Sequence, residues 1–126
     1  MRAAIGVSIS AALLCLFACG GGPLPTGTFR GEHSLEVKPG TDPVIANQLR
    51  RVVVTIAEDG KATIENGGLP MEGLASRRGD TLAIEVLAVS GINIEKQPPE
   101  VPRRLELKIE FEDKLRFGDA VLNRVR

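Results

Sequence analysis

Aromatic side chains are scarce in this sequence: its 126 residues contain no tryptophan, no tyrosine and only four phenylalanines. Phe17 lies in the apolar N-terminal segment, which leaves Phe29, Phe111 and Phe117 for the rest of the chain. Surfaces that bind single-stranded nucleic acid or sugars usually stack their ligand on aromatic rings. Three phenylalanines can hardly build such a platform, and the composition therefore disfavours both classes of ligand.

An excess of charge is also missing, because sixteen Lys and Arg residues balance sixteen Asp and Glu residues. Loss of Arg2 with an N-terminal signal would leave fifteen basic against sixteen acidic residues. Proteins that bind nucleic acid or an anionic bilayer through charge need a strong positive field. The charge balance therefore predicts no nucleic acid partner.

The sequence lacks an apolar run of about 20 residues, the length that a transmembrane helix needs. Its apolar segment, residues 3–17, is shorter and contains Gly6, Ser8 and Ser10. Arg2 precedes the segment, and small residues follow it. A charged start, a short apolar centre and small residues at the end are typical of a secretory signal peptide.

The end of this segment, Leu16-Phe17-Ala18-Cys19, resembles the lipobox of bacterial lipoproteins. In that family a leucine lies three residues before the cysteine and a small residue lies directly before it. The resemblance implies that residues 1–18 are a lipoprotein signal peptide, cut ahead of Cys19, and that Cys19 receives a diacylglycerol and an N-acyl chain. Cys15 matches less well, because Leu14 is too large for the cleavage site. The alternative is an ordinary signal peptide, or an uncut anchor, with two incidental cysteines.

The segment after the expected cleavage site is rich in glycine and proline, with Gly20-Gly21-Gly22-Pro23-Leu24-Pro25-Thr26-Gly27. Such a composition predicts that residues 19–27 are the lipidated cysteine and a flexible tether. In lipoproteins an aspartate directly after the cysteine usually retains the protein at the inner membrane. Gly20 stands there instead, so the resemblance implies lipid anchoring in the cell envelope, at the outer membrane where the cell has one.

Both cysteines, Cys15 and Cys19, lie in the N-terminal segment. If Cys15 leaves with the signal and Cys19 becomes a thioether, the remaining domain has no thiol and no disulfide. Thiol chemistry and cysteine–metal sites are then excluded. His33 is the only histidine, and the scattered carboxylates lack the spacing of a zinc or copper site, so we expect no metal and no cofactor.

The remaining residues, 28–126, have the length of one small domain and show the period-two alternation of β-strands. Asp42-Pro43 predicts an N-cap and first helical residue of a short helix over residues 44–48. The prolines at 98, 99 and 102 predict a long loop over residues 91–103, with residues 92–94 paired at an edge. The alternation predicts seven strands: 29–38, 52–57, 61–65, 71–77, 81–89, 105–112, and 115–117 continued by 120–125. Residues 66–70 are expected to form a loop, and Phe111 is expected on the apolar face of its strand with Leu105, Leu107 and Ile109. The strand 81–89 is expected to be central and covered on much of both faces.

The segment Glu58-Asp59-Gly60 predicts a hairpin, and the apolar pattern selects its register. A three-residue loop places Ile56 opposite Ala62 and Val54 opposite Ile64. A two-residue loop would pair apolar with polar side chains, because a slip of one residue turns every side chain to the other face. The three-residue loop, with Gly60 in the left-handed conformation, is therefore predicted.

About seven short strands joined by tight turns, without a long helix, predict an all-β fold: a small antiparallel meander closed into a barrel or packed as a sandwich. Gly27-Thr28-Phe29 at the start of the first strand resembles the opening of lipocalins, in which one residue separates a glycine from a tryptophan. Phenylalanine takes the place of tryptophan here. This resemblance implies a carrier of a small apolar ligand.

His33 is the residue best suited to acid–base chemistry, since its ordinary pKa lies near neutrality. It falls on the apolar face of the first predicted strand, with Glu32 and Ser34 on the opposite face. A catalytic Ser–His pair would have to use Ser76 or Ser90. We therefore expect a histidine near the core or rim with a backbone hydrogen bond, and no catalytic residue.

Other charged patterns have structural explanations. The doublets Arg50-Arg51, Arg77-Arg78 and Arg103-Arg104 are predicted to flank strands and discourage edge pairing, although a basic rim for an acidic partner is an alternative. Arg78-Gly79-Asp80 matches a cell-adhesion tripeptide, but a turn needs the same residues. Glu106, Glu110 and Glu112 alternate with Lys108 on a strand face that we expect to be solvated.

Three functions follow. The first is a non-catalytic envelope lipoprotein whose β-domain serves as an interaction or structural module, anchored in lipid and in contact with an envelope protein. The alternative is a lipocalin-like carrier of a small apolar ligand, which would need open volume inside the barrel. The third, an enzyme, is disfavoured because no nucleophile–base–orienter set is recognisable. A filled barrel distinguishes the first function from the second.

Overall fold

The computed structural model describes residues 22–125. The predicted signal peptide and Cys19 lie outside these residues. The described elements are β1 (Gly27–Glu32), α2 (Pro43–Arg50), β2 (Arg51–Ile56), β3 (Lys61–Asn66), β4 (Leu69–Arg78), β5 (Thr81–Val89), β6 (Ile92–Asn93), the 3₁₀ turn η1 (Ile94–Lys96), β7 (Arg104–Phe111), β8 (Lys114–Phe117) and β9 (Ala120–Arg124).

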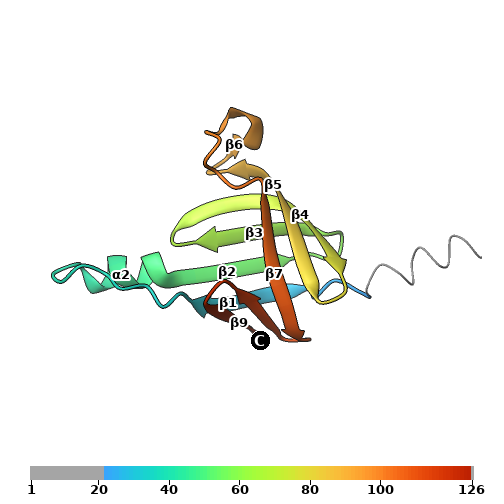
Figure 1. Ribbon diagram of the computed structural model, residues 1–126, viewed down its shortest axis with the longest axis horizontal. Coiled ribbons are helices and arrows are strands. Elements are labelled where there is room, and N and C mark those ends of the chain that lie inside the picture. Colours follow the sequence, from blue (N-terminus) through green and yellow to red (C-terminus); the bar gives the residue numbers. More distant parts are fainter. Residues whose placement is uncertain (1–21, 126) are drawn as a thin grey trace, which may run out of the picture.

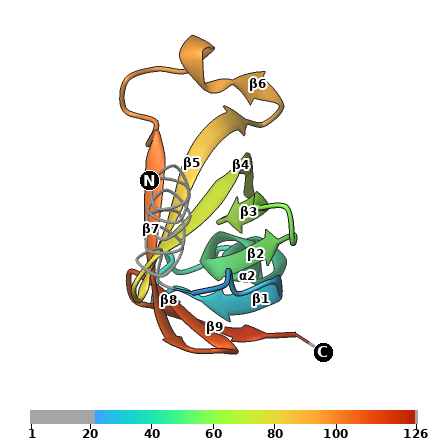
Figure 2. The same ribbon diagram turned by 90° about the vertical axis from the view of Figure 1, so that its right-hand side faces the viewer.

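Eight of these strands, all except β6, form a closed antiparallel meander (Figure 2). Each strand pairs with the next one along the chain, with β5 pairing with β7, and the last strand, β9, pairs with the first, β1. The closing seam is short, with Phe29 opposite Arg124 and Arg30 opposite Asn123. The all-β prediction is confirmed, and the fold is a barrel. The described residues contain nine strands instead of seven, because Gly118-Asp119 splits the last predicted strand into the β8–β9 hairpin and β6 pairs with β5 outside the barrel.

The hairpin of β2 and β3 has the predicted register. Val54 lies opposite Ile64 and Ile56 lies opposite Ala62. Gly60 has a φ of 92°, the left-handed conformation that such a loop requires. Side chains of alternate residues on both strands thus point to the same interior.

The side chains that face the barrel axis are apolar and fill its interior. No polar or charged side chain is buried within residues 22–125. The core cluster consists of Phe29, Val52, Val54, Ile56, Ala62, Ile64, Met71, Leu82, Ile84, Val86, Val89, Leu105, Leu107, Ile109, Leu115, Ala120 and Leu122. Every barrel strand contributes to it, as the period-two pattern requires.

Two glycines allow strands to approach each other more closely than any side chain permits. A Cβ on Gly31 in β1 would meet the carbonyl oxygen of Val121 in β9, and a Cβ on Gly73 in β4 would meet that of Glu85 in β5. At Gly73 the register of β4 and β5 shifts, which marks a bulge. These glycines therefore permit the bends that close a small barrel.

The first predicted strand is too long, because β1 ends at Glu32 and residues 33–38 leave the sheet. The backbone N–H of His33 donates to the carbonyl of Arg50, and that of Ser34 donates to the Asp119 carboxylate. The first bond continues the pairing with β2, whereas the second takes the place of a bond to a neighbouring strand. Leu35, expected on the apolar face, is 46% exposed.

Phe111, expected inside the barrel, is 65% exposed. The pairing of β7 with β8 shifts between Ile109 and Phe111, so the alternation of β7 reverses at its end. The one extra residue of this bulge turns Phe111 outward. Lys114 lies over its ring, with the ammonium 5.7 Å from the ring centroid.

Three smaller predictions also need correction. Residues 69 and 70, expected in a loop, are the first residues of β4. The outer face of β5 is less covered than expected, because Glu85 and Leu87 are exposed. The predicted helix is present and longer, reaching Arg50, and its N-cap is Asp42, whose carboxylate accepts the N–H of Val44 at 2.8 Å.

The last residues of the predicted tether belong to the folded domain. Leu24 packs against the core and Pro25 is buried. The Arg77 guanidinium donates to the carbonyl of Pro23 at 2.9 Å, and β1 already begins at Gly27. Within the described residues, contacts with the barrel thus begin at residue 23, ahead of the predicted start of the β-domain at residue 28.

The barrel has two distinct ends (Figure 1). The tether end consists of residues 23–26 and the turns β2–β3, β4–β5 and β7–β8. The helix end consists of α2, the turns β3–β4 and β8–β9, and the segment 90–103 with β6 and η1. Because the strands alternate in direction, every second connection falls at the same end.

Candidate functional site

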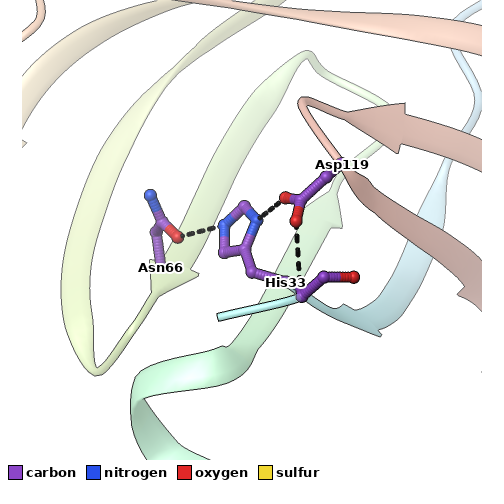
Figure 3. Close-up of polar contacts among 4 residues, drawn as sticks. His33, Asn66 and Asp119 are labelled. Carbon is purple, nitrogen blue, oxygen red and sulfur yellow. Dashed lines mark hydrogen bonds and ion pairs between the residues drawn. The ribbon is translucent and has the colours of Figure 1, made fainter. Parts of the chain in front are cut away.

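The side chain of His33 lies at the helix end of the barrel between two polar side chains (Figure 3). Its Nδ1 is 2.7 Å from Oδ1 of Asp119, and its Nε2 is 2.9 Å from Oδ1 of Asn66. The Phe117 ring lies against the imidazole, with ring centroids 5.8 Å apart. We call His33, Asn66 and Asp119 the histidine cluster.

The barrel topology brings the members of the histidine cluster together from distant parts of the chain. His33 directly follows β1, Asn66 ends β3, and Asp119 lies in the β8–β9 turn. Gly118, with a φ of 58°, makes that turn possible and presents the aspartate to the end of β1. The cluster thus joins the last hairpin of the barrel to its first and third strands.

The Asp119 carboxylate accepts two hydrogen bonds. One oxygen contacts the His33 ring, and the other accepts the backbone N–H of Ser34 at 2.8 Å. The hydrogen bond from His33, followed by that from Ser34, lowers the pKa of Asp119 below its ordinary value of 3.8, because both bonds stabilise the charged form. The carboxylate is therefore ionised at neutral pH, and the 54% exposure of its side chain also favours the charged form.

Both ring nitrogens of His33 have partners in the protein. A ring protonated on both nitrogens donates to Asp119 and to the Asn66 oxygen; a neutral ring accepts from the Asn66 amide once that amide turns. The hydrogen bond between His33 and Asn66 can therefore form with either the doubly protonated or the neutral ring. The imidazole is 23% exposed and held on both sides, an arrangement suited to holding strands together.

An aspartate–histidine pair is also part of a catalytic triad, so the third partner decides what the pair can do. Here that partner is the amide of Asn66 and not a hydroxyl group. Ser76 lies in β4 opposite Ala83, and Ser90 follows β5 with its backbone bonded to Pro70. Within residues 22–125 neither serine is hydrogen-bonded to His33.

The prediction for His33 is confirmed in its position at the rim but incomplete in its partners. Its backbone N–H bonds to Arg50 as a strand residue would, whereas its ring binds two side chains that the sequence did not single out. Asp119 is 86 residues away from His33, and Asn66 is 33 residues away. Their only local signal is the Gly-Asp and Asn-Gly turn chemistry that places them beside strand ends.

The arginine doublets lie at strand ends, as predicted, but on both ends of the barrel. One member of each doublet donates to backbone carbonyls of a loop, at 2.7–3.1 Å. The acceptors are Leu35 for Arg50, Pro23 and Gly79 for Arg77, and Gln97, Pro98 and Val101 for Arg103. The doublets therefore fix loops and do not gather into one basic rim.

The remaining sequence candidates lie on the surface. Gly79-Asp80 forms the β4–β5 turn, with Arg78 at the end of β4. Glu106 and Glu112 are exposed, whereas Glu110 is partly covered and pairs with Arg116 at 2.5 Å. The described residues hold no group of three His, Cys, Asp or Glu that could bind a metal ion. Over the same residues, α2 and the other helical segments are too short and too polar to span a bilayer.

We expect an Asp119→Asn variant to lose stability in a pH-dependent way. The folded-state pKa of Asp119 is lowered, so its stabilising effect is present above the unfolded value of 3.8 and lost as the pH falls through the folded value. Urea midpoints measured across this range should differ between wild type and variant near neutral pH and converge in acid. Glu100→Gln, which removes an exposed loop carboxylate, serves as the control. A difference independent of pH would contradict the assignment.

No protein-family model, no curated protein and no solved structure matches the chain. Its functional interpretation therefore rests on its own residues: a filled antiparallel barrel, a histidine cluster at the helix end and a fixed N-terminal segment at the tether end.

Proposed function

We propose that this protein is a lipid-anchored lipoprotein of the bacterial envelope, with Cys19 as the lipidated residue and the barrel as a non-catalytic interaction or structural module. The observation that carries the proposal is the sequence Leu16-Phe17-Ala18-Cys19, which follows a short apolar segment and immediately precedes the glycine-rich segment. Several acyl chains hold a protein at a membrane, at about 0.8 kcal/mol for each buried CH₂ group.

The fold supports a module without a bound ligand. Large apolar side chains from every barrel strand occupy the interior, and both nitrogens of the one histidine are engaged in the histidine cluster. Nucleophilic catalysis with His33 as the base would need a nucleophile within hydrogen-bond reach of its ring. The arrangement instead favours a rigid body whose outer surface makes the contacts.

A second function, a carrier of a small apolar ligand, is favoured by one observation: the barrel has eight antiparallel strands in meander order, the architecture that lipocalins use. A depression of about 400 Å³ at the tether end is open to solvent. Its lining includes the apolar Leu24, Ile109 and Phe111 and the charged Arg77, Glu110 and Arg124. Carrier sites are enclosed and mostly apolar, so the filled interior favours the first function.

The test of the anchor is metabolic labelling with radioactive palmitate, together with mass spectrometry of the purified protein. Wild type and Cys15→Ala are expected to incorporate label and to begin at an acylated residue 19. Cys19→Ala should incorporate none, because the acceptor sulfur is missing. An unlabelled wild-type protein that retains residues 1–18 would refute the proposal. An apolar ligand that copurifies with the barrel would instead favour the carrier.

A further inference from the structure

The tether end of the barrel carries an exposed aromatic residue that the core does not use. Phe111 is 65% exposed, and Val125, the last described residue, is 44% exposed. Pro23 is exposed as well, and with Phe111 it borders the depression at this end. Lys114 places its ammonium over the face of the Phe111 ring. Protein surfaces that lie in the membrane interface combine exposed apolar side chains, Phe among them, with Lys or Arg.

Residues 23–26 are fixed to the same end of the barrel by several contacts. Arg77 donates to the carbonyl of Pro23, Leu24 packs against the core, and Pro25 is buried. The guanidinium of Arg124 donates to the carbonyl of Thr26. Pro23 is therefore a fixed point of the described chain at the tether end.

The length of chain between this point and Cys19 limits how the barrel can lie. Three glycines separate Cys19 from Pro23, and even when fully extended the four steps of chain from one to the other span at most about 14 Å. The nine residues of β5 span roughly 30 Å, or roughly 20–25 Å along the barrel axis at the usual strand tilt. A lipid on Cys19 therefore cannot reach past the barrel to its helix end.

We propose that the tether end rests on the surface of the bilayer, with Phe111 at the level of the lipid headgroups, so that the helix end faces the aqueous side. This inference rests on the proposed lipidation of Cys19. It names the partner of one surface, a phospholipid bilayer, and it assigns Phe111 as the interfacial residue.

The charges at the tether end agree with a contact that does not depend on anionic lipid. Its described basic and acidic side chains are equal in number and interspersed. The basic residues are Lys61, Arg77, Arg78, Lys114, Arg116 and Arg124, and the acidic residues are Glu58, Asp59, Asp80, Glu110, Glu112 and Asp113, with Arg116 and Glu110 forming an ion pair. A polybasic surface would gain about 1 kcal/mol per Lys or Arg from an anionic membrane. The balanced surface predicts the same orientation on zwitterionic phosphatidylcholine.

The absence of tryptophan from the chain makes a single introduced tryptophan an unambiguous reporter. The acylated full-length variants Phe111→Trp, Val44→Trp and Leu87→Trp are reconstituted on phosphatidylcholine vesicles with and without bromine on the acyl chains. Val44 is 73% exposed on α2 at the helix end, and Leu87 is 46% exposed on the barrel wall. All three substitutions are at exposed apolar positions, so the fold is retained.

Brominated lipid is expected to quench most of the fluorescence of Phe111→Trp and to leave that of Val44→Trp and Leu87→Trp nearly unchanged. Flotation of each variant with the vesicles and its acylated mass are measured in the same samples. An acylated protein that floats but shows no quenching at position 111, or stronger quenching at position 44 or 87, overturns the orientation while the anchor stands. A protein without acyl chains overturns both.

Discussion

Gly31→Ala is expected to destabilise the barrel by about 3 kcal/mol, at the upper end of the cost of overpacking. The added Cβ would meet the carbonyl oxygen of Val121 and the side chain of Leu122 in β9. A backbone atom cannot move aside as the tip of a side chain can, so β1 and β9 must separate. The seam between them has only two register pairs, and it is the place where the barrel closes.

Urea denaturation measures this loss, and hydrogen exchange locates it. The amide of Val125 should lose protection first, because it donates across the seam to the carbonyl of Thr28, whereas the amide of Arg124 donates to Asp113 in the β7–β8 turn and should be affected less. Arg30→Ala, at the neighbouring exposed position of β1, is the control and should cost no more than about 0.5 kcal/mol. Equal stability of Gly31→Ala and Arg30→Ala would show that the strands approach less closely.

Phe29→Ala is expected to cost about 3–5 kcal/mol, the range for removing a buried aromatic ring. Phe29 is completely buried and belongs to both pairings of β1, opposite Val54 in β2 and Arg124 in β9. The Arg124 guanidinium also lies 4.8 Å from the centroid of its ring. Truncation therefore leaves a cavity at the closing seam and removes a cation–π contact.

Phe111→Ala provides the matched control, because it makes the same chemical change in a strand residue that is 65% exposed. It should change the free energy of unfolding by no more than about 0.5 kcal/mol. The two variants together test the bulge in β7, since an inward Phe111 would make both substitutions equally costly. A small effect of Phe29→Ala would contradict the filled core.

The two ends of the barrel have different consequences for function. The histidine cluster stabilises the helix end by joining the β8–β9 turn to β1 and β3. Exposed apolar residues of α2, among them Val44 and Ile45, lie at this end as well. With the tether end on the bilayer, the helix end would be the surface presented to other envelope components.

Local patterns in the sequence were sufficient where each residue depends on its neighbours along the chain. The register of β2 and β3 follows from the alternation of Val54, Ile56, Ala62 and Ile64, because a slip would bury polar side chains. The start of α2 follows from the capping chemistry of Asp42 and the fixed φ of Pro43. The all-β class follows from the same period-two pattern repeated along the chain.

The sequence pattern gave a wrong prediction where a contact with a residue far away in the sequence changed the path of a strand. The alternation of residues 33–38 predicts strand, but the Asp119 carboxylate binds the ring of His33 and the N–H of Ser34, and the chain leaves the sheet there. The alternation of β7 predicts a buried Phe111, but a bulge against β8 turns it outward. Neither partner can be identified from residues nearby in the sequence.

The sequence by itself thus determined the class of fold and the approximate positions of most strands, because both depend on local spacing; the anchor at Cys19 stays a prediction from the same local pattern. Only the tertiary structure decided that the sheet closes into a barrel, that His33 meets Asn66 and Asp119, and that residues 23–26 are fixed beside Phe111. The physical reason is that closure depends on β1 meeting β9 almost a hundred residues later, where Gly31 lets the backbones touch.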